Sequence, residues 1–337
     1  SQWIGGIYFL FSILLLIDIF DENLKKSFTN FLYLSSKEIV KQAFKIIIIY
    51  TALTFFIFIG LKILDLRTFD AFNLSMTIIS SGGFIPVNNF DLLFVTDVSK
   101  LTLSILMLSS YFSLFFIYNL FFFRKKNINY LSEDFYLAIY LIIVISFIFV
   151  FFNFDNNFLN ILVSIISSIS NLGISFEDTP KNLSFIFLIL VIIGGSFFST
   201  SSGIRFIKIY SLIKFSLNQI LSFSKPRNIF MNRLLFSKTN FEINEINKYF
   251  LSIIIFIISL LVLTSLVALS GIDFERCLKI SILTLMNTVN SSSYGINDFD
   301  FQNINFLTKY SLIMFMIVGR IELLTFLLII KKYLFKN

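Results

Sequence analysis

The chain has 337 residues, of which 57% are hydrophobic and only 14% are charged. A soluble domain carries about 25% charged residues, and a soluble chain this apolar would lack the polar side chains needed to cover its surface. The composition therefore excludes a cytosolic enzyme and an intrinsically disordered chain, and it predicts a polytopic membrane protein. The net charge of +7 becomes informative once it is assigned to one side of the membrane.

Two features of the residue content limit the chemistry that the chain can perform. It has no His, which excludes His-based acid–base catalysis and His metal ligation. Its one cysteine, Cys277, allows neither a disulfide framework nor a cysteine metal site. We therefore expect a protein that is not an enzyme, with no catalytic residue and no bound cofactor.

Seven stretches are long and apolar enough to cross a bilayer, which takes about 20 helical residues. Three shorter apolar stretches lie between them, at about 69–81, 158–171 and 277–288, and each ends in small or polar residues. Short apolar runs of this kind are typical of re-entrant segments. The seven expected spans are about 3–20, 44–64, 99–123, 134–154, 183–211, 246–270 and 306–330.

Charge alternates between the segments that connect the spans. The connections that hold the short apolar stretches carry 6 Lys and Arg against 11 acidic residues, whereas the other connections and the C-terminal tail carry 19 against 7. Because Lys and Arg concentrate on the cytoplasmic side, we expect the short stretches outside and the C-terminus in the cytoplasm. Anionic lipids are the expected partners of the basic segment 205–238, and docking of a cytoplasmic regulator is the alternative. We expect no nucleic-acid partner.

The order span, short segment, span occurs three times, and the span at 3–20 looks like the second half of a fourth unit. We therefore predict an all-α polytopic membrane protein. Its pseudo-fourfold span–pore-loop–span repeats would surround a central ion pathway, with the first repeat incomplete. The expected units are 1–43, 44–133, 134–245 and 246–337.

The ends of the three short segments are suited to holding a cation. Each is an apolar half-helix followed by a short polar stretch, and non-helical backbone at membrane depth must line water or be buried in protein. Glycine permits the backbone conformations that aim successive carbonyls at one axis. Rings of carbonyls can replace the hydration shell of an alkali cation. We favour a pore, and the alternative is three amphipathic outer loops without one.

The fifth expected span is interrupted at its centre, where three Gly and four Ser fall within 194–203. Such a run should unwind the helix, and broken helices mark substrate paths in transporters. The alternative is a close helix contact through small residues, which needs far fewer of them. We expect no Asp or Glu near this break, which argues against a coupled carrier.

The last expected span carries two charged residues, Arg320 and Glu322, inside an otherwise apolar run. A charge deep in a span is costly unless it faces water or a partner, and residues two apart on a helix point in different directions. We expect Glu322 to form a structural ion pair with a neighbouring span. Arg320 would face the pathway as an electrostatic barrier to cations, with a purely structural ion pair as the alternative.

Four segments resemble the Trk/Ktr/HKT superfamily of potassium transporters, most closely its bacterial TrkH-type membrane subunits. They are 1–6, 79–84 (Ile-Ser-Ser-Gly-Gly-Phe), 193–205 with its Gly and Ser residues, and 319–323 (Gly-Arg-Ile-Glu-Leu). The segments follow the family's order over almost the whole chain. The resemblance implies four repeats around one pore, with one filter residue in each loop.

The resemblance also assigns roles to particular residues. Arg320 would lie in the pathway below the filter, and K⁺ would be the only metal, bound at the filter. The implied filter residues are Gly83, Gly173 and Asn290, flanked by Ser81, Gly82, Asn171, Leu172, Thr288 and Val289. The implied gate is the segment Gly194, Gly195, Ser196, Phe197, Phe198, Ser199, Thr200, Ser201, Ser202 and Gly203.

The function implied by the resemblance is uptake of K⁺ across the bacterial cytoplasmic membrane, by the pore-forming subunit of a Trk-type channel or symporter. The implied partners are a second copy of the chain and a cytoplasmic nucleotide-binding regulatory subunit like TrkA. Two departures stand out: Asn290 replaces the usual filter glycine, which would weaken selectivity for K⁺ over Na⁺, and Phe197 and Phe198 replace small residues in the gate. The alternative function is a secondary carrier for Na⁺ or another solute, with its site at the broken helix.

Overall fold

The structure is a computed structural model. It describes residues 1–20, 39–87, 90–114, 116–117, 131–151, 158–176, 179–224, 243–296, 304–321 and 326–327. Within these ranges the chain forms helices and loops, and the one β-type pairing is an isolated bridge between Ile193 and Ile204. The predicted all-α class is confirmed.

The chain begins with one helix and continues with a first complete unit. Helix α1 covers Gln2–Phe20. The unit that follows consists of the long helix α3 (Ile39–Ile63), the short helix α4 (Thr68–Ser80) and helix α5 (Asp97–Tyr111). A single turn, η1 (Phe90–Leu92), lies between α4 and α5. Thr96 caps α5, because its side chain accepts a hydrogen bond from the Ser99 amide.

The next unit contains the broken helix that the Gly- and Ser-rich segment predicts. Its long helix α7 covers Leu131–Phe151, and its short helix α8 covers Phe158–Ile169. The second span is split into α9 (Ser184–Ile192) and α10 (Phe206–Ser224), with η2 (Lys181–Leu183) before α9. The predicted interruption of this span is therefore confirmed.

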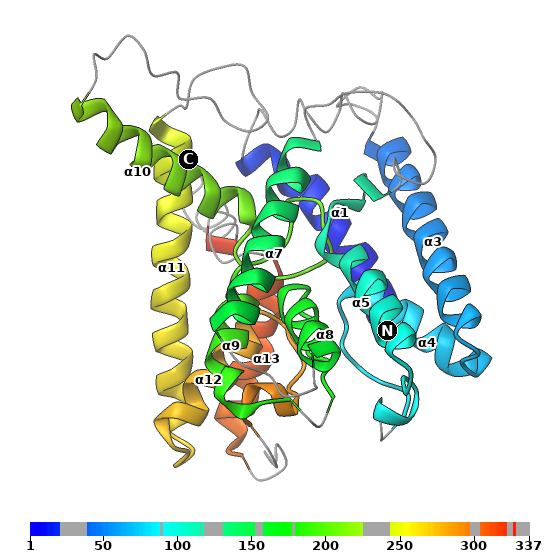
Figure 1. Cartoon of the computed structure of the whole chain (residues 1–337). Helices are drawn as coiled ribbons and strands as arrows, with labels where there is room; N and C mark the ends of the chain where they lie inside the picture. Colours follow the sequence, from blue (N-terminus) through cyan, green and yellow to red (C-terminus); the bar gives the residue numbers. More distant parts are fainter. Residues whose placement is uncertain are drawn as a thin grey trace.

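The last unit repeats the same order without a break in the described residues. Helix α11 covers Ile243–Ala268, the short helix α12 covers Phe274–Leu285, and α13 covers Phe306–Ile321, with η4 (Ser292–Tyr294) between the last two. The turns between α3 and α4 and between α11 and α12 lie at the same end of the molecule (Figure 1). We call α4, α8 and α12 the half-helices. All three match the short apolar stretches predicted from the sequence.

Of the seven expected spans, three meet the length and composition of a membrane span in the described part of the chain. They are Ala43–Ile63, Glu133–Phe151 and Ile246–Ala268, in α3, α7 and α11, the first helix of each complete unit. The expected span at 99–123 is not one continuous helix. Helix α5 ends at Tyr111 because Phe112 adopts an extended backbone, with φ −77° and ψ 161°.

The units pack around one another in chain order. Each half-helix contacts the last helix of the preceding unit or, for the broken span, its first part: α4 contacts α1, α8 contacts α5 and α12 contacts α9. Helix α13 contacts α1, so the last unit also meets the first helix. This ring of contacts is the arrangement expected for pseudo-symmetric repeats, and it brings the ends of the half-helices together.

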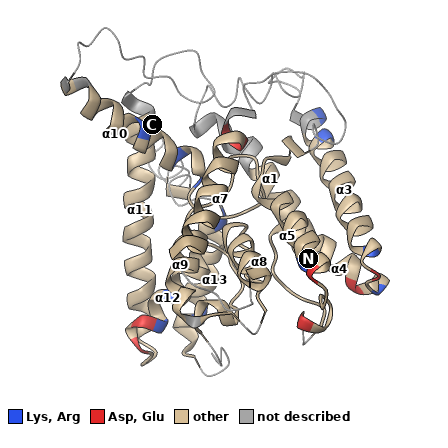
Figure 2. Cartoon of the chain, viewed as in Figure 1, with Lys and Arg blue, Asp and Glu red and all other residues tan. Residues whose placement is uncertain are grey.

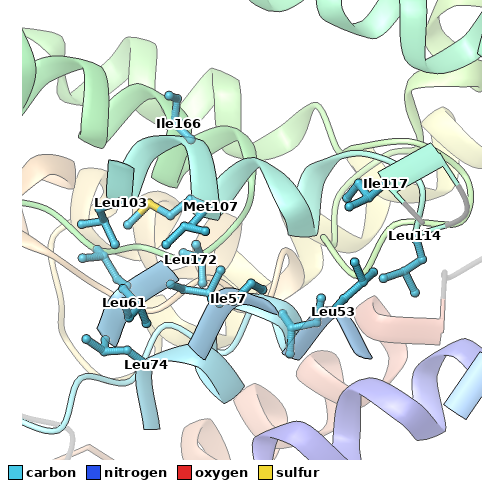
Figure 3. Close-up of a cluster of buried hydrophobic side chains, with 14 of the residues drawn as sticks. Leu53, Ile57, Leu61, Leu74, Leu103, Met107, Leu114, Ile117, Ile166 and Leu172 are labelled. Atoms are coloured by element: carbon cyan, nitrogen blue, oxygen red, sulfur yellow. The ribbon is translucent and has the colours of Figure 1, made fainter. Parts of the chain in front are cut away.

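Among the described residues, two large apolar clusters hold the units together. The first lies between α3, α4, α5 and α8, where Ile57, Leu74, Met107 and Ile166 pack with Leu172 of the loop after α8 (Figure 3). The second joins α8 and α9 to α7, α11 and α12 in the same way. Each cluster crosses a boundary between units, so the units are packed as one body.

The outward faces of the long helices are apolar and exposed. Helix α7 exposes Ile142, Phe147 and Val150, and α11 exposes Phe250 and Leu261. Charged residues lie at the ends of α3, α7 and α12 and on α10, and the middles of α3, α7 and α11 carry none (Figure 2). Large apolar side chains left in contact with water would be unfavourable over so wide an area. The molecule is therefore a membrane protein with its apolar faces in lipid.

Candidate functional site

The three half-helices end in the same backbone motif. A residue one or two positions after each helix has a left-handed conformation: Ser81 has φ 51°, Asn171 has φ 58° and Asn287 has φ 51°. In each case the next amide bonds back to a carbonyl five residues earlier, as in Leu172 N to Ser167 O at 2.9 Å. The equivalent bonds after α4 and α12 are also 2.9 Å. Each half-helix therefore ends in a Schellman motif. The shared motif allows the three turns to be aligned residue by residue.

The shared motif sets the register of the third loop. Two residues after the left-handed residue, the first two loops have Gly83 and Gly173, with φ +74° and +75°. The same step from Asn287 leads to Val289. The motif match that aligned Asn290 with these glycines was therefore displaced by one residue. The side chain of Asn290 is turned back to its own loop, because Nδ2 donates to Ile296 O at 3.0 Å.

The backbones of the three loops meet at one place. A Cβ atom on Gly83 would overlap Leu172 O, and a Cβ atom on Gly173 would overlap Val289 O. Only glycine permits this approach together with a positive φ. The predicted filter segments, which come from three different units, are thus in direct contact.

Polar side chains support this junction from within the fold. Thr77 Oγ1 lies 2.9 Å from Phe84 O and 3.0 Å from Gln2 Oε1, so α1 also reaches the first of the three loops. Ser167 Oγ accepts a hydrogen bond from the Ile174 amide at 2.7 Å. Two of these bonds join a loop to its half-helix and the third joins α4 to α1, so the loops are positioned by the half-helices and by α1.

Two further bonds link the second loop to the third and to α9. Asn171 Nδ2 donates to Thr288 Oγ1 at 3.2 Å and to Val191 O at 2.9 Å. Asn171 is fully buried and lies at the left-handed position. One side chain therefore fixes the loop after α8 against two neighbouring elements.

The 194–203 loop is buried and closed upon itself. The chain enters and leaves it side by side, with Gly194 N bonded to Ile204 O at 2.9 Å and Ile204 N bonded to Ile192 O at 3.0 Å. The loop is also bonded to the end of α5, where Ser196 N donates to Tyr111 O at 3.1 Å. The predicted gate therefore lies against the point where α5 ends.

Arg205, directly after the loop, satisfies several of its carbonyl groups. The guanidinium Nη1 lies 2.9 Å from Ser201 O and 3.2 Å from Ser196 O. The same atom lies 3.2 Å from Ser199 Oγ. Arg205 is almost fully buried. A buried arginine of this kind stabilises a loop whose carbonyls have no helical partner.

Arg320 connects the 194–203 loop to the end of a half-helix. Its Nη1 donates to Ser202 Oγ at 2.6 Å, and its Nη2 donates to Ser80 O at 3.0 Å. The guanidinium also lies over the ring of Phe9, 4.6 Å from the ring centroid, and the guanidinium of Arg205 lies 5.2 Å from the same centroid. Arg320 thus lies between the predicted filter and the predicted gate. The other charged residue predicted in this span, Glu322, is outside the described residues.

The two aromatic residues of the loop pack in the apolar core. Phe197 and Phe198 are 6% and 7% exposed, and their ring centroids are 5.0 Å apart. Both belong to the apolar cluster that α3, α4, α5 and α8 form. Their bulk therefore anchors the loop in the core.

The structure also places two acidic residues against the broken helix, contrary to the expectation from the sequence. Asp134 Oδ1 accepts from the Ser113 amide at 2.9 Å, and Glu133 Oε1 accepts from the Phe197 amide at 3.0 Å. Both side chains are almost fully buried. The expectation that no carboxylate lies near the break is wrong, because α7 brings these residues from about 60 positions upstream. Their signal in the sequence was a pair of acids at the start of a predicted span.

The geometry defines an all-helical membrane protein of span–half-helix–span units, with three loop ends meeting at one point above a broken helix. No protein-family model matches the sequence, and no curated protein matches it either. Among solved structures, the chain is similar to the potassium transporter TrkH from Vibrio parahaemolyticus, with a TM-score of 0.75 and 20% sequence identity. The similarity covers 97% of this chain and 70% of that one. The protein therefore has a TrkH-like fold.

Proposed function

We propose that the chain is the pore-forming subunit of a channel or transporter that takes up K⁺ across a membrane. The meeting of the loops at Gly83, Gly173 and Val289 carries the proposal. Backbone carbonyls brought together at the ends of half-helices can replace the water around an alkali cation. The C-terminal ends of the half-helices add negative dipole potential at the same point.

The elements below this junction suit the control of an ion path. The 194–203 loop would act as the gate, and Arg320 as a positive barrier between filter and gate. The resemblance to the Trk/Ktr/HKT superfamily and the fold shared with a potassium transporter support the same assignment. In this proposal the subunit lies in the bacterial cytoplasmic membrane. Its proposed partners are a second copy of the chain, a TrkA-like nucleotide-binding subunit and anionic lipids.

Ion flux in liposomes tests this function. The protein, with any residues that precede Ser1 in its gene, would be reconstituted in liposomes and assayed for uptake of radiolabelled Rb⁺ and Na⁺. We expect Rb⁺ uptake that empty liposomes lack. Correctly folded protein, supplied with its regulator, that passes neither ion would refute the proposal.

A secondary carrier for Na⁺ or another solute is the second candidate, and one observation favours it. Glu133 and Asp134 lie at the broken helix, and carboxylates within the membrane commonly belong to ion or proton paths. The two functions differ in whether the transported solute can be accumulated against its own gradient. A channel would pass Rb⁺ at a rate set by the electrochemical gradient of Rb⁺ alone, whereas a coupled carrier would accumulate solute against its own gradient.

A further inference from the structure

Two helix breaks face each other in this molecule. The first separates α9 from α10 and contains the 194–203 loop. The second ends α5, where Phe112 is extended and the following segment runs back to the loop. The two are joined by backbone bonds in both directions: Ser201 N donates to Ser110 O at 3.1 Å, and Leu114 N donates to Phe198 O at 3.3 Å.

One pair of carboxylates serves both breaks. Asp134 accepts the Ser113 amide at the α5 break, and the neighbouring Glu133 accepts the Phe197 amide in the loop, at 2.9 and 3.0 Å. The exposed fraction is 1% for Asp134 and 3% for Glu133. A buried amide left without an acceptor is costly, so these bonds favour the present arrangement of both breaks over any in which they separate.

Arg205 complements the pair from the other side of the loop. Its guanidinium holds the carbonyls of Ser196 and Ser201, and its positive charge attracts Glu133. In the loop, the Phe197 amide thus bonds a carboxylate, and the carbonyls of Ser196 and Ser201 bond a guanidinium. Charge-assisted bonds at both sides are stronger than bonds between neutral groups.

We propose that Glu133 and Asp134 are positioning residues that lock the α5 break and the 194–203 loop into one unit, and that release of the Phe197 amide from Glu133 frees the loop to move. The proposal rests on the proposed gating role of the loop, because freeing the loop would open the path. It requires no contact between the carboxylates and the transported ion.

The mobility of the loop can be measured without ion flux. The reporter is Thr200→Cys in a Cys277→Ser background, in the full protein in liposomes, and the readout is its rate of modification by a membrane-impermeant methanethiosulfonate reagent. Glu133→Ala should raise this rate about tenfold, the change in loop equilibrium expected for loss of one buried charged acceptor. Glu133→Gln should raise it less, since its amide oxygen can still accept the bond.

A second reporter and a matched control separate locking from general loosening. The second reporter is Ser281→Cys, at a fully buried position of α12 that bonds neither carboxylate, and it should keep its slow rate in every variant. Glu275→Ala removes an exposed carboxylate from the same helix and should leave both rates unchanged. Asp134→Ala removes the acceptor of the Ser113 amide at the other break and decides the outcome if Glu133→Ala does not fold.

The outcomes are distinct for the two proposals. Faster modification at position 200 alone supports the lock, and it does so even if no variant conducts Rb⁺, which would remove the proposed function instead. Unchanged modification in Glu133→Ala and Asp134→Ala would overturn the lock. An equal rise at positions 200 and 281 would also overturn it.

Discussion

Val289 occupies the place where the other two loops have glycine. Gly83 and Gly173 adopt positive φ values, whereas Val289 does not. A β-branched residue is confined to the negative φ region, so the peptide at this position is oriented differently from its two counterparts. The third loop therefore offers a different carbonyl arrangement to a cation.

This difference leads to a prediction about ion selectivity. Val289→Gly would let the third loop adopt the backbone of the other two, and it should raise the ratio of Rb⁺ to Na⁺ uptake in liposomes. Asn290→Gly is the matched control, since it makes a similar change one residue later, where the side chain bonds Ile296 O. A rise in the ratio with Asn290→Gly and not with Val289→Gly would restore Asn290 as the filter residue.

The close approach of the loops at Gly173 predicts a second effect. Gly173→Ala should destabilise the protein in two ways: about 1–2 kcal/mol for an L-residue at a left-handed φ, and about 1–3 kcal/mol for overpacking against Val289. Gly271→Ala is the control, because Gly271 has a similar φ of +76° but open space where the Cβ would lie. It should show the first cost alone.

Thermal unfolding in detergent measures both substitutions. We expect Gly173→Ala to have the lower melting temperature and to lose Rb⁺ uptake, and Gly271→Ala to keep its uptake. Equal melting temperatures for the two variants would show that the loops can separate at Gly173 without cost. The close contact would then not be required for the fold.

At the scale of elements, Arg320 joins four parts of the fold: α13, the end of α4, the 194–203 loop and α1 through Phe9. Arg320→Ala should raise Rb⁺ uptake, because it removes both a positive charge between filter and gate and a bond to the loop. A barrier lower by about 1.4 kcal/mol gives about a tenfold faster rate, and we expect at least that increase. Arg276→Ala, at an exposed position, is the control.

Arg320→Lys separates the two contributions. Lysine keeps the charge but cannot bond Ser202 and Ser80 with one planar group. Uptake near that of the original protein would assign the barrier to charge, and uptake near that of Arg320→Ala would assign it to the bonds. Loss of folded protein in both variants would instead support a purely structural arginine.

Local patterns in the sequence predicted the half-helices and the broken span, because apolar runs with polar ends and a run of Gly and Ser act within one segment. The end of α5 at Tyr111 had no such signal, since the residues after it remain apolar. The break there is set by bonds to the 194–203 loop. The contacts of Glu133 and Asp134 depend on the packing of α7 against that loop, and no spacing within the sequence reports them.

At the scale of the whole molecule, the ring of units accounts for the position of the site. Each half-helix packs against the unit before it, and α13 meets α1. Three loops therefore converge at the centre while the apolar faces of α7 and α11 point outward. The first position in the ring is occupied by α1, whose Gln2 reaches the loop after α4 through Thr77.

The distribution of charge predicts how the molecule lies in the membrane. The connections that hold the half-helices are acidic overall, and the other connections are basic, so the positive-inside rule places the turn before α12 outside and α10 at the cytoplasmic side. In a Cys277→Ser background, Asp273→Cys should react with an impermeant maleimide in intact cells. Ser216→Cys, exposed on α10, should react only after the cells are opened. The reverse pattern would invert the topology, and the loops that meet at Gly83, Gly173 and Val289 would then face the cytoplasm, where they could not select cations for uptake.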